Sequence, residues 1–241
     1  MSSITSGLNE RLDELYRIYW PGLTEALMDV KGYQEVTNPL LLHLRDEEQY
    51  ILSDYKVMIF GQETNDWGQN FGARTISQLY EDYNGFFHQG DCYKYGGHFW
   101  NSFKSYSNAI QSLFPDKSVS FLWNNVIKIG RLGKPGSPEE LFTKIQLELL
   151  PVLKEELRIL NPDLILFFSG PRYDRFIQEQ FQHVEFTPVQ GYRQTELSRI
   201  HIKEYPKLAY RTYHPNYLYR RGREYNEHIK QAILSAISSV E

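Results

Sequence analysis

Polar side chains of chemically useful types end several short apolar runs in this sequence. An acid, two amides, a hydroxyl and an imidazole stand at these positions, namely Gln62, Glu63, Asn124, Ser169 and His214. Carboxylates and imidazoles exchange protons with reacting groups, and amides hydrogen-bond to the edges of polar rings. When several separate apolar runs each end in such a group, they indicate a shared site more strongly than any single motif does.

The elements that must position these residues alternate between strand and helix. Strands are expected at 56–60, 118–123, 163–168 and 208–213, and helices at 98–113, from Pro138 to about Leu160, at 172–181 and at 223–239. This alternation predicts an α/β fold, a three-layer α/β/α sandwich with a mostly parallel central sheet of about four strands. In such sheets ligands bind outside the carboxyl ends of the strands.

Domain organisation is expected to be simple. The length fits one domain over residues 1–241, with an N-terminal helical segment at about 1–50 and an irregular insertion at about 64–97. Within the first segment, residues 8–28 carry leucines and tyrosines at helical spacing. The insertion is rich in Gly, Asn, Asp and Tyr, and long irregular loops are often functional.

Composition excludes several classes of protein. The net charge is −4, so any phosphate binding must come from a local basic patch. With one cysteine, Cys92, and no metal-ligand spacing, we expect neither a disulfide framework nor a metal or other cofactor. The start of the chain lacks a signal-peptide pattern, and no apolar stretch approaches the length of a membrane span, so the cytoplasm is the expected compartment.

Four segments together carry a family resemblance. Residues 61–65 read Gly-Gln-Glu-Thr-Asn, 121–127 read Phe-Leu-Trp-Asn-Asn-Val-Ile, 214–218 read His-Pro-Asn-Tyr-Leu before Arg221-Gly222, and 97–100 read Gly-His-Phe-Trp. These segments follow one another along the chain in the family's order, and they resemble the motifs of the uracil-DNA glycosylase superfamily. The fourth is similar to the Asn-His-Phe-Trp segment of its mismatch-specific thymine branch. The resemblance implies a glycosylase that flips a base out of DNA.

Such a reaction sets three requirements. Donors must face the base oxygens, where negative charge grows as the base leaves. A negative group must lie near the cation-like sugar and hold a water. A pocket must accept the extruded base and read its edge.

The resemblance assigns a role to each motif residue. Glu63 and His214 are the catalytic candidates: Glu63 for the sugar and water, His214 as donor to the departing base. Gln62 would bind the base through its backbone N–H, with its side-chain amide as a second candidate donor. Asn124 would read the base edge, with Asn125 a rival for this role.

The remaining roles concern the base and the DNA strand. Phe99 is the favoured stacking ring, with Trp67 as the alternative, and Asn65 stands where the uracil-specific branch has a Tyr that excludes thymine. The residues expected to contact DNA, including Leu218 as an apolar wedge, are Ser169, Gly170, Pro215, Asn216, Leu218, Arg220, Arg221 and Arg223. DNA is the expected partner, with no membrane and no obligatory protein partner.

Departures from the family pattern keep a second function open. Glu63 replaces the usual Asp or Asn and is one methylene longer, and Thr64 replaces a rigidifying Pro. Asn65 should relax the exclusion of thymine. The first hypothesis is a glycosylase acting on uracil or a related damaged or mismatched base. The alternative is a member that binds a nucleobase, nucleotide or modified nucleic acid without turnover; a hydrolase of nucleotide-like small molecules is a third.

Overall fold

The computed structural model describes residues 6–205 and 207–239. Contacts divide the chain into two compact units, each made of three stretches of sequence. Unit 1 comprises Met1–Leu52, Glu63–Gln89 and Ile127–Asn161, and unit 2 comprises Ser53–Gln62, Gly90–Val126 and Pro162–Glu241. Residues 1–5 lie outside the described residues. The predicted single domain and the predicted N-terminal helical segment both begin at residue 1, and the expectation about a signal peptide also rests on these first residues.

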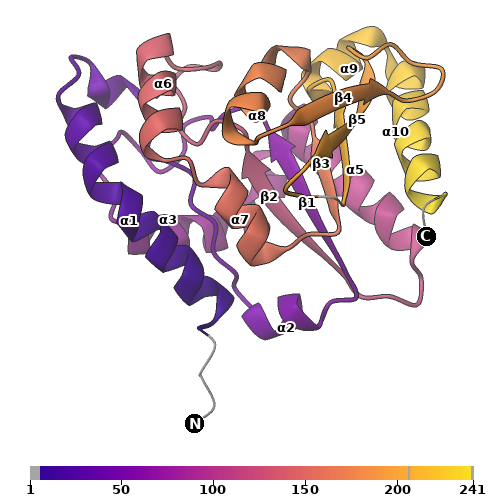
Figure 1. Ribbon diagram of the computed structural model, residues 1–241, viewed down its shortest axis with the longest axis horizontal. Coiled ribbons are helices and arrows are strands. Elements are labelled where there is room, and N and C mark those ends of the chain that lie inside the picture. Colours follow the sequence, from indigo (N-terminus) through magenta and orange to yellow (C-terminus); the bar gives the residue numbers. More distant parts are fainter. Residues whose placement is uncertain (1–5, 206, 240–241) are drawn as a thin grey trace. The chain divides into compact units, whose positions relative to one another are not determined.

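The sheet belongs entirely to unit 2. Its described strands lie in the order β2-β1-β3-β6-β5-β4. Figure 1 labels β1 to β5. Their bounds are β1 (Tyr55–Gly61), β2 (Val119–Asn125), β3 (Leu164–Phe167), β4 (Val184–Pro188), β5 (Leu197–Ile202) and β6 (Leu208–Thr212). The first four in this order are parallel, and β5 and β4 continue the sheet as antiparallel strands. This mixed α/β fold, consistent with an α/β/α sandwich, confirms the predicted class.

The central parallel strands are apolar because the sheet is covered on both faces. Every residue of β3 is buried, and in β1 only Lys56 is not. Strands buried on both faces read as continuous apolar runs rather than alternating ones. The register pairs Gly61 with Asn125 and Phe60 with Phe167, so β1, β2 and β3 end at the same edge. That edge carries the residues singled out from the sequence.

The sheet is larger than the predicted one of about four strands. The four predicted strands are the parallel ones, and β4 and β5 were not expected. β4 lies at the edge of the sheet and buries only Phe186 of its five residues. An edge strand of this kind has no continuous apolar run, which explains why the sequence does not mark it.

Helices of unit 2 pack beside the sheet. They are α4 (Asp91–Tyr95), α5 (Gly97–Leu113), α8 (Asp174–Gln180), α9 (Pro215–Arg221) and α10 (Arg223–Ser238). α5, α9 and α10 contact one another, and α10 also contacts β6 (Figure 1). α10 buries Ile229, Ile233 and Ile237, which are spaced one helical turn apart. The predicted helices at 98–113 and 223–239 are thereby confirmed.

Unit 1 is helical. Its α-helices are α1 (Leu8–Met28), α2 (Glu47–Leu52), α3 (Ile76–Tyr83), α6 (Glu140–Leu149) and α7 (Leu153–Leu160). α1 confirms the predicted helix at 8–28, and Pro21 lies inside it without ending it. The single helix expected from Pro138 to about Leu160 is wrong: α6 and α7 are separate, and Pro151 stands in the break, where it cannot continue a helix.

The insertion predicted as irregular at 64–97 is partly helical. It contains α3, a π-helical turn at Asn84–His88, and α4. Thr75 caps α3: its hydroxyl accepts from the backbone N–H of Gln78, whose side chain in turn accepts from the backbone N–H of Thr75. This capping box, Thr followed three residues later by Gln, was a readable helix signal in the sequence.

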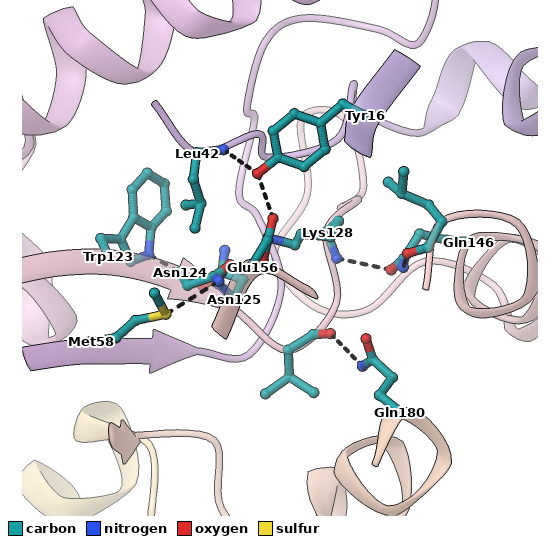
Figure 2. Close-up of polar contacts among 12 residues, drawn as sticks. Tyr16, Leu42, Met58, Trp123, Asn124, Asn125, Lys128, Gln146, Glu156 and Gln180 are labelled. Carbon is teal, nitrogen blue, oxygen red and sulfur yellow. Dashed lines mark hydrogen bonds and ion pairs between the residues drawn. The ribbon is translucent and has the colours of Figure 1, made fainter. Parts of the chain in front are cut away.

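A fully buried ion pair lies in the core of unit 1. Lys128 Nζ lies 2.7 Å from both carboxylate oxygens of Glu156, and both side chains are 0% exposed. The hydroxyl of Tyr16 donates to Glu156 Oε1 at 2.6 Å and accepts from the backbone N–H of Leu42 at 3.0 Å (Figure 2). These bonds connect α1, α7 and the segment that follows β2. Within the described ranges, no helix is long and apolar enough to cross a bilayer.

Candidate active site

Asn125, the last residue of β2, has a buried side-chain amide where the parallel strands reach their carboxyl ends. It lies two residues after Trp123, so the two side chains share one face of the strand. The indole Nε1 of Trp123 donates to Asn125 Oδ1 at 3.3 Å (Figure 2). Asn125 is 2% exposed, and its Nδ2 hydrogen-bonds to nothing in the described part of the chain. A buried donor of this kind calls for a ligand or another explanation.

Asn124, the predicted reader of the base, points to the opposite face. Its Nδ2 lies 3.6 Å from Met58 Sδ, and its Oδ1 accepts from the backbone N–H of Asn125 at 2.8 Å (Figure 2). The side chain is 0% exposed and is engaged with neighbouring protein groups. Of the two adjacent amides that the sequence left as rivals, Asn125 is the one beside the aromatic ring described next.

Gly61 allows that ring to approach the amide. A Cβ at Gly61 would overlap Asn125 Oδ1 and would lie 3.2 Å from the ring of Phe99. Phe99 stands in the first turn of α5, is half-buried, and meets Trp100 and Phe168 edge-on with ring centroids 5.1 and 6.4 Å away. Glycine is therefore needed at the end of β1, because any side chain would separate the strand from this ring.

His214 lies parallel to Phe99. The two ring centroids are 5.9 Å apart, and the planes differ by 16°. Unit 2 thus brings three of the predicted functional types together: an amide at the end of β2, a ring at the start of α5, and an imidazole just after β6.

The hydrogen bonding of His214 fixes which nitrogen carries its proton. His214 caps α9, and its Nδ1 accepts from the backbone N–H of Asn216 at 3.2 Å. An accepting nitrogen carries no proton, so in the neutral ring Nε2 is the donor. Burial, reinforced by nearby His98, lowers the pKa of His214 to about 4. At neutral pH this imidazole is an uncharged donor.

Gln62, Ser169 and Gly170 hold the strand ends together. The side-chain Nε2 of Gln62 donates to the backbone carbonyl of Ser169 at 2.6 Å. The backbone N–H of Gly170 donates to the carbonyl of Thr212 at 2.9 Å. Ser169 and Gly170 are buried, and this N–H is already engaged. The Gly170 N–H is therefore not available to a phosphate in this conformation, and the expected phosphate contacts of Ser169 and Gly170 stay predictions.

The predicted wedge, Leu218, is not at the surface. It lies on α9, whose start at Pro215 directly follows His214, and only 1% of it is exposed. Pro215 is also buried, whereas Asn216 is exposed. The expected exposed loop is a short helix, and its phase turns Leu218 inwards and its neighbours Tyr217 and Tyr219 outwards, at 41% and 40% exposure.

Aromatic and basic side chains occupy the outer side of α9 and its junction with α10. Tyr219 stacks on His98 of α5, with ring centroids 4.1 Å apart and planes at 29°. Arg220, Arg221 and Arg223 are exposed, which a contact with a phosphate backbone would require. The guanidinium of Arg221 lies over the ring of Tyr225, 5.2 Å from its centroid.

Glu63 directly follows Gln62 in the chain and belongs to unit 1. It is half-buried, and its Oε2 accepts from Ser137 Oγ at 3.5 Å. The next residue, Thr64, is buried, with its hydroxyl 3.0 Å from that of Thr37. Gly130 packs so closely that a Cβ there would overlap the carbonyl of Thr64. These contacts fix the loop at the position where the family motif has a rigid Pro.

The other two predicted base-binding residues also lie in unit 1. Asn65 is exposed and forms a short parallel bridge with Arg131. Trp67 is 7% exposed and meets Tyr83 and Phe86 edge-on, at centroid distances of 6.5 and 5.8 Å. This packing places the Trp67 ring among aromatic side chains of unit 1, and the choice between Phe99 and Trp67 as the stacking ring stays a prediction.

Sequence reasoning missed three ring-bearing residues of the candidate site. Trp123, which donates to the amide, and His98 and Tyr219, which form an exposed ring pair, were not assigned roles. The spacing of Trp123 and Asn125 was a usable signal, because residues two apart on a strand share a face. Among the described residues no cluster of three or more His, Cys, Asp or Glu side chains could hold a metal ion.

Comparison with known families shows which superfamily the chain belongs to. The model of the uracil DNA glycosylase superfamily matches residues 49–237. The chain belongs to this superfamily, whose members are glycosylase-like proteins. No curated protein matches the chain.

Proposed function

We propose that this protein is a DNA glycosylase that hydrolyses the N-glycosidic bond of uracil or of a related damaged or mismatched base. One observation carries the proposal. The buried amide of Asn125 and the neutral imidazole of His214 flank the half-buried ring of Phe99 at the carboxyl end of a parallel sheet. A flat ring can stack on Phe99 while both polar groups address its edge, as a flipped base requires.

His214 stabilises the departing base. As the bond between the sugar C1′ and the base nitrogen breaks, its electron pair leaves with the base. Negative charge then grows on the base oxygens. The Nε2–H of neutral His214 donates to one of these oxygens, and the helix cap at Nδ1 holds the imidazole in the required tautomer.

Asn125 takes the reading role that the motif alignment gives to Asn124. Its Nδ2, which has no partner among the described residues, can donate to a base carbonyl, while its Oδ1 accepts from the indole of Trp123. Asn124 has its Nδ2 against a sulfur atom and its Oδ1 on the backbone. Asn124 therefore supports the strand end rather than the ligand.

Glu63 serves the sugar and the water. Its carboxylate stabilises positive charge on the deoxyribose and accepts a proton from the attacking water, whose oxygen bonds to C1′. The hydrogen bond from Ser137 Oγ restrains this side chain, and Thr64 anchors the loop that carries it. These restraints support a fixed carboxylate in a residue one methylene longer than the family's Asp.

The outer side of α9 binds the DNA backbone. Arg220, Arg221 and Arg223 offer guanidinium groups to phosphates, and the exposed Tyr219 ring on His98 offers a stacking surface to an unpaired base. Tyr219 thereby replaces the buried Leu218 as the contact next to the extruded nucleotide.

The test is base release from an oligonucleotide panel, followed by alkaline cleavage of abasic sites. The panel holds uracil, hypoxanthine and mismatched thymine in single- and double-stranded DNA. The wild type should cleave at least the uracil strand, and Glu63→Gln and His214→Ala should abolish release while remaining folded. Asn125→Ala should slow release by about 10²- to 10³-fold.

The adjacent substitution Asn124→Ala is the matched control. It should lower thermal stability more than the rate of base release. Wild-type protein that releases no base from any strand would refute the proposal, and a rate loss in Asn124→Ala equal to that in Asn125→Ala would refute the assignment of the amide.

A specific observation favours a second candidate, a nucleobase-binding protein without turnover. Glu63, Thr64 and Asn65 all depart from the family motif that holds the water. This candidate predicts that free uracil raises the melting temperature although no abasic product forms. Multiple turnovers in the strand-cleavage assay would exclude it.

A further inference from the structure

The hydrogen bond between Trp123 and Asn125 determines which way the buried amide faces. An amide can rotate by half a turn and exchange its oxygen and nitrogen, and the two orientations have nearly the same shape. An indole N–H can only donate a hydrogen bond. The group facing Trp123 Nε1 must therefore be the oxygen, Oδ1, at 3.3 Å.

This choice leaves the Nδ2 group of Asn125 directed elsewhere. Both side chains are buried, at 5% exposure for Trp123 and 2% for Asn125, so water does not compete for the bond. Rotating the amide would place its N–H donors against the indole N–H and would lose the hydrogen bond. The amide thus offers donors, rather than its oxygen, to a ligand that approaches on this side.

The indole itself is held in place. Trp100 of α5 meets Trp123 edge-on, with ring centroids 4.9 Å apart and planes at 73°. Trp100 in turn lies edge-on against Phe99, the stacking ring of the proposed function. The same helix therefore positions the ring that holds the base and the ring that orients the amide.

We propose that Trp123 is a positioning residue that makes the site specific for bases with a carbonyl at the edge facing Asn125. Uracil carries O4 there and hypoxanthine carries O6, and each accepts from Nδ2. Cytosine and adenine carry an amino group instead, so donor would face donor. This inference rests on the proposed function, because it assumes that Asn125 faces the base.

The experiment compares Trp123→Phe with wild type. Phenylalanine keeps an aromatic ring and removes the donor, so Asn125 is free to present either group. Single-turnover release is measured from strands that contain uracil or cytosine at the same position. We expect the uracil-to-cytosine rate ratio to fall about tenfold or more, since that is the range for one buried hydrogen bond. Trp20→Phe, the same substitution at an indole of α1 that packs on Phe71, should keep the ratio.

The outcomes separate this inference from the proposed function. If wild type releases uracil and Trp123→Phe keeps the full uracil-to-cytosine ratio, the inference is overturned while the proposed function stands. If wild type releases no base, the proposed function fails, and binding of free uracil and free cytosine is compared by thermal shift. A wild-type preference for uracil that Trp123→Phe loses would support the inference; equal preference in both proteins, or binding of neither base, would overturn it.

Discussion

The protonation of His214 shows how one residue combines structural and chemical roles. Its Nδ1 caps α9 by accepting the backbone N–H of Asn216, and this bond exists only when Nδ1 is unprotonated. Burial favours the neutral ring for the same reason, because a charge loses its solvation there. The contact that starts the helix therefore also leaves the proton of the neutral ring on Nε2.

Burial, together with nearby His98, predicts a pH dependence for His214. Its pKa is lowered from 6.5 to about 4 in the folded protein. The unfolded chain binds this proton first as pH falls, so the contribution to folding stability is complete above pH 6.5 and is lost as pH falls towards 4. The imidazole should titrate near pH 4 by NMR, and the stability difference between wild type and His214→Asn should shift against wild type from pH 7 to 5.

His98 offers a control for the electrostatic part of this effect. Its proximity is the second cause of the lowered pKa, so His98→Asn should raise the midpoint of His214 without restoring the ordinary value. An unshifted midpoint near 6.5 in the wild type would contradict the buried, neutral imidazole.

At this scale the sequence identified the residue types better than their orientation. The motif indicates an amide at the end of β2, but two asparagines follow each other there, and a shift of one residue moves a side chain to the other face. Only the register, Gly61 opposite Asn125, shows which of the two lies beside Phe99. His214 and Phe99 each stand alone in their motifs, and their rings lie beside each other in unit 2, while their roles stay predictions.

At the scale of elements, helical phase decides what a motif residue can do. Leu218 stands at the motif position of an exposed wedge, yet one helical turn after His214 it faces the core. Sequence patterns placed the parallel strands and the long helices because these have strong apolar periodicity. The edge strand β4 lacks such periodicity, so it was missed. The break at Pro151 was missed because it depends on the local backbone limits of proline.

The buried ion pair between α7 and the segment after β2 makes a prediction at this scale. Lys128→Met would remove the cation that lies against the buried carboxylate of Glu156, while Tyr16 still donates to that carboxylate. We expect a loss of about 3–5 kcal/mol in the free energy of unfolding, measured by urea denaturation. The double variant Lys128→Met with Glu156→Leu should recover much of this loss, since no charge then remains buried.

An exposed pair provides the comparison. Lys144 and Glu148 lie 3.7 Å apart on α6 with most of each side chain in solvent, so Lys144→Met should change stability by less than about 1 kcal/mol. A double variant as unstable as the sum of its single substitutions would show that Lys128 and Glu156 do not interact energetically.

For the whole molecule, net charge and local charge point in opposite directions. The chain carries −4 overall, which disfavours nonspecific attraction to DNA. The three exposed arginines at the junction of α9 and α10 form a local positive surface that composition alone does not reveal. The proposed phosphate binding at this surface would release condensed counterions, so affinity for DNA should depend on salt even though the whole protein is acidic.

The slope of that dependence tests how many of these arginines contact phosphates. Binding of fluorescently tagged DNA should be measured by anisotropy over a range of KCl concentrations. Arg220→Gln and Arg221→Gln should each weaken binding and reduce the slope of log affinity against log salt by about 1. Arg158→Gln, which removes an exposed arginine paired with Glu155 on α7, should leave the slope unchanged. If all three substitutions act alike, only net charge matters, and the DNA does not lie along α9.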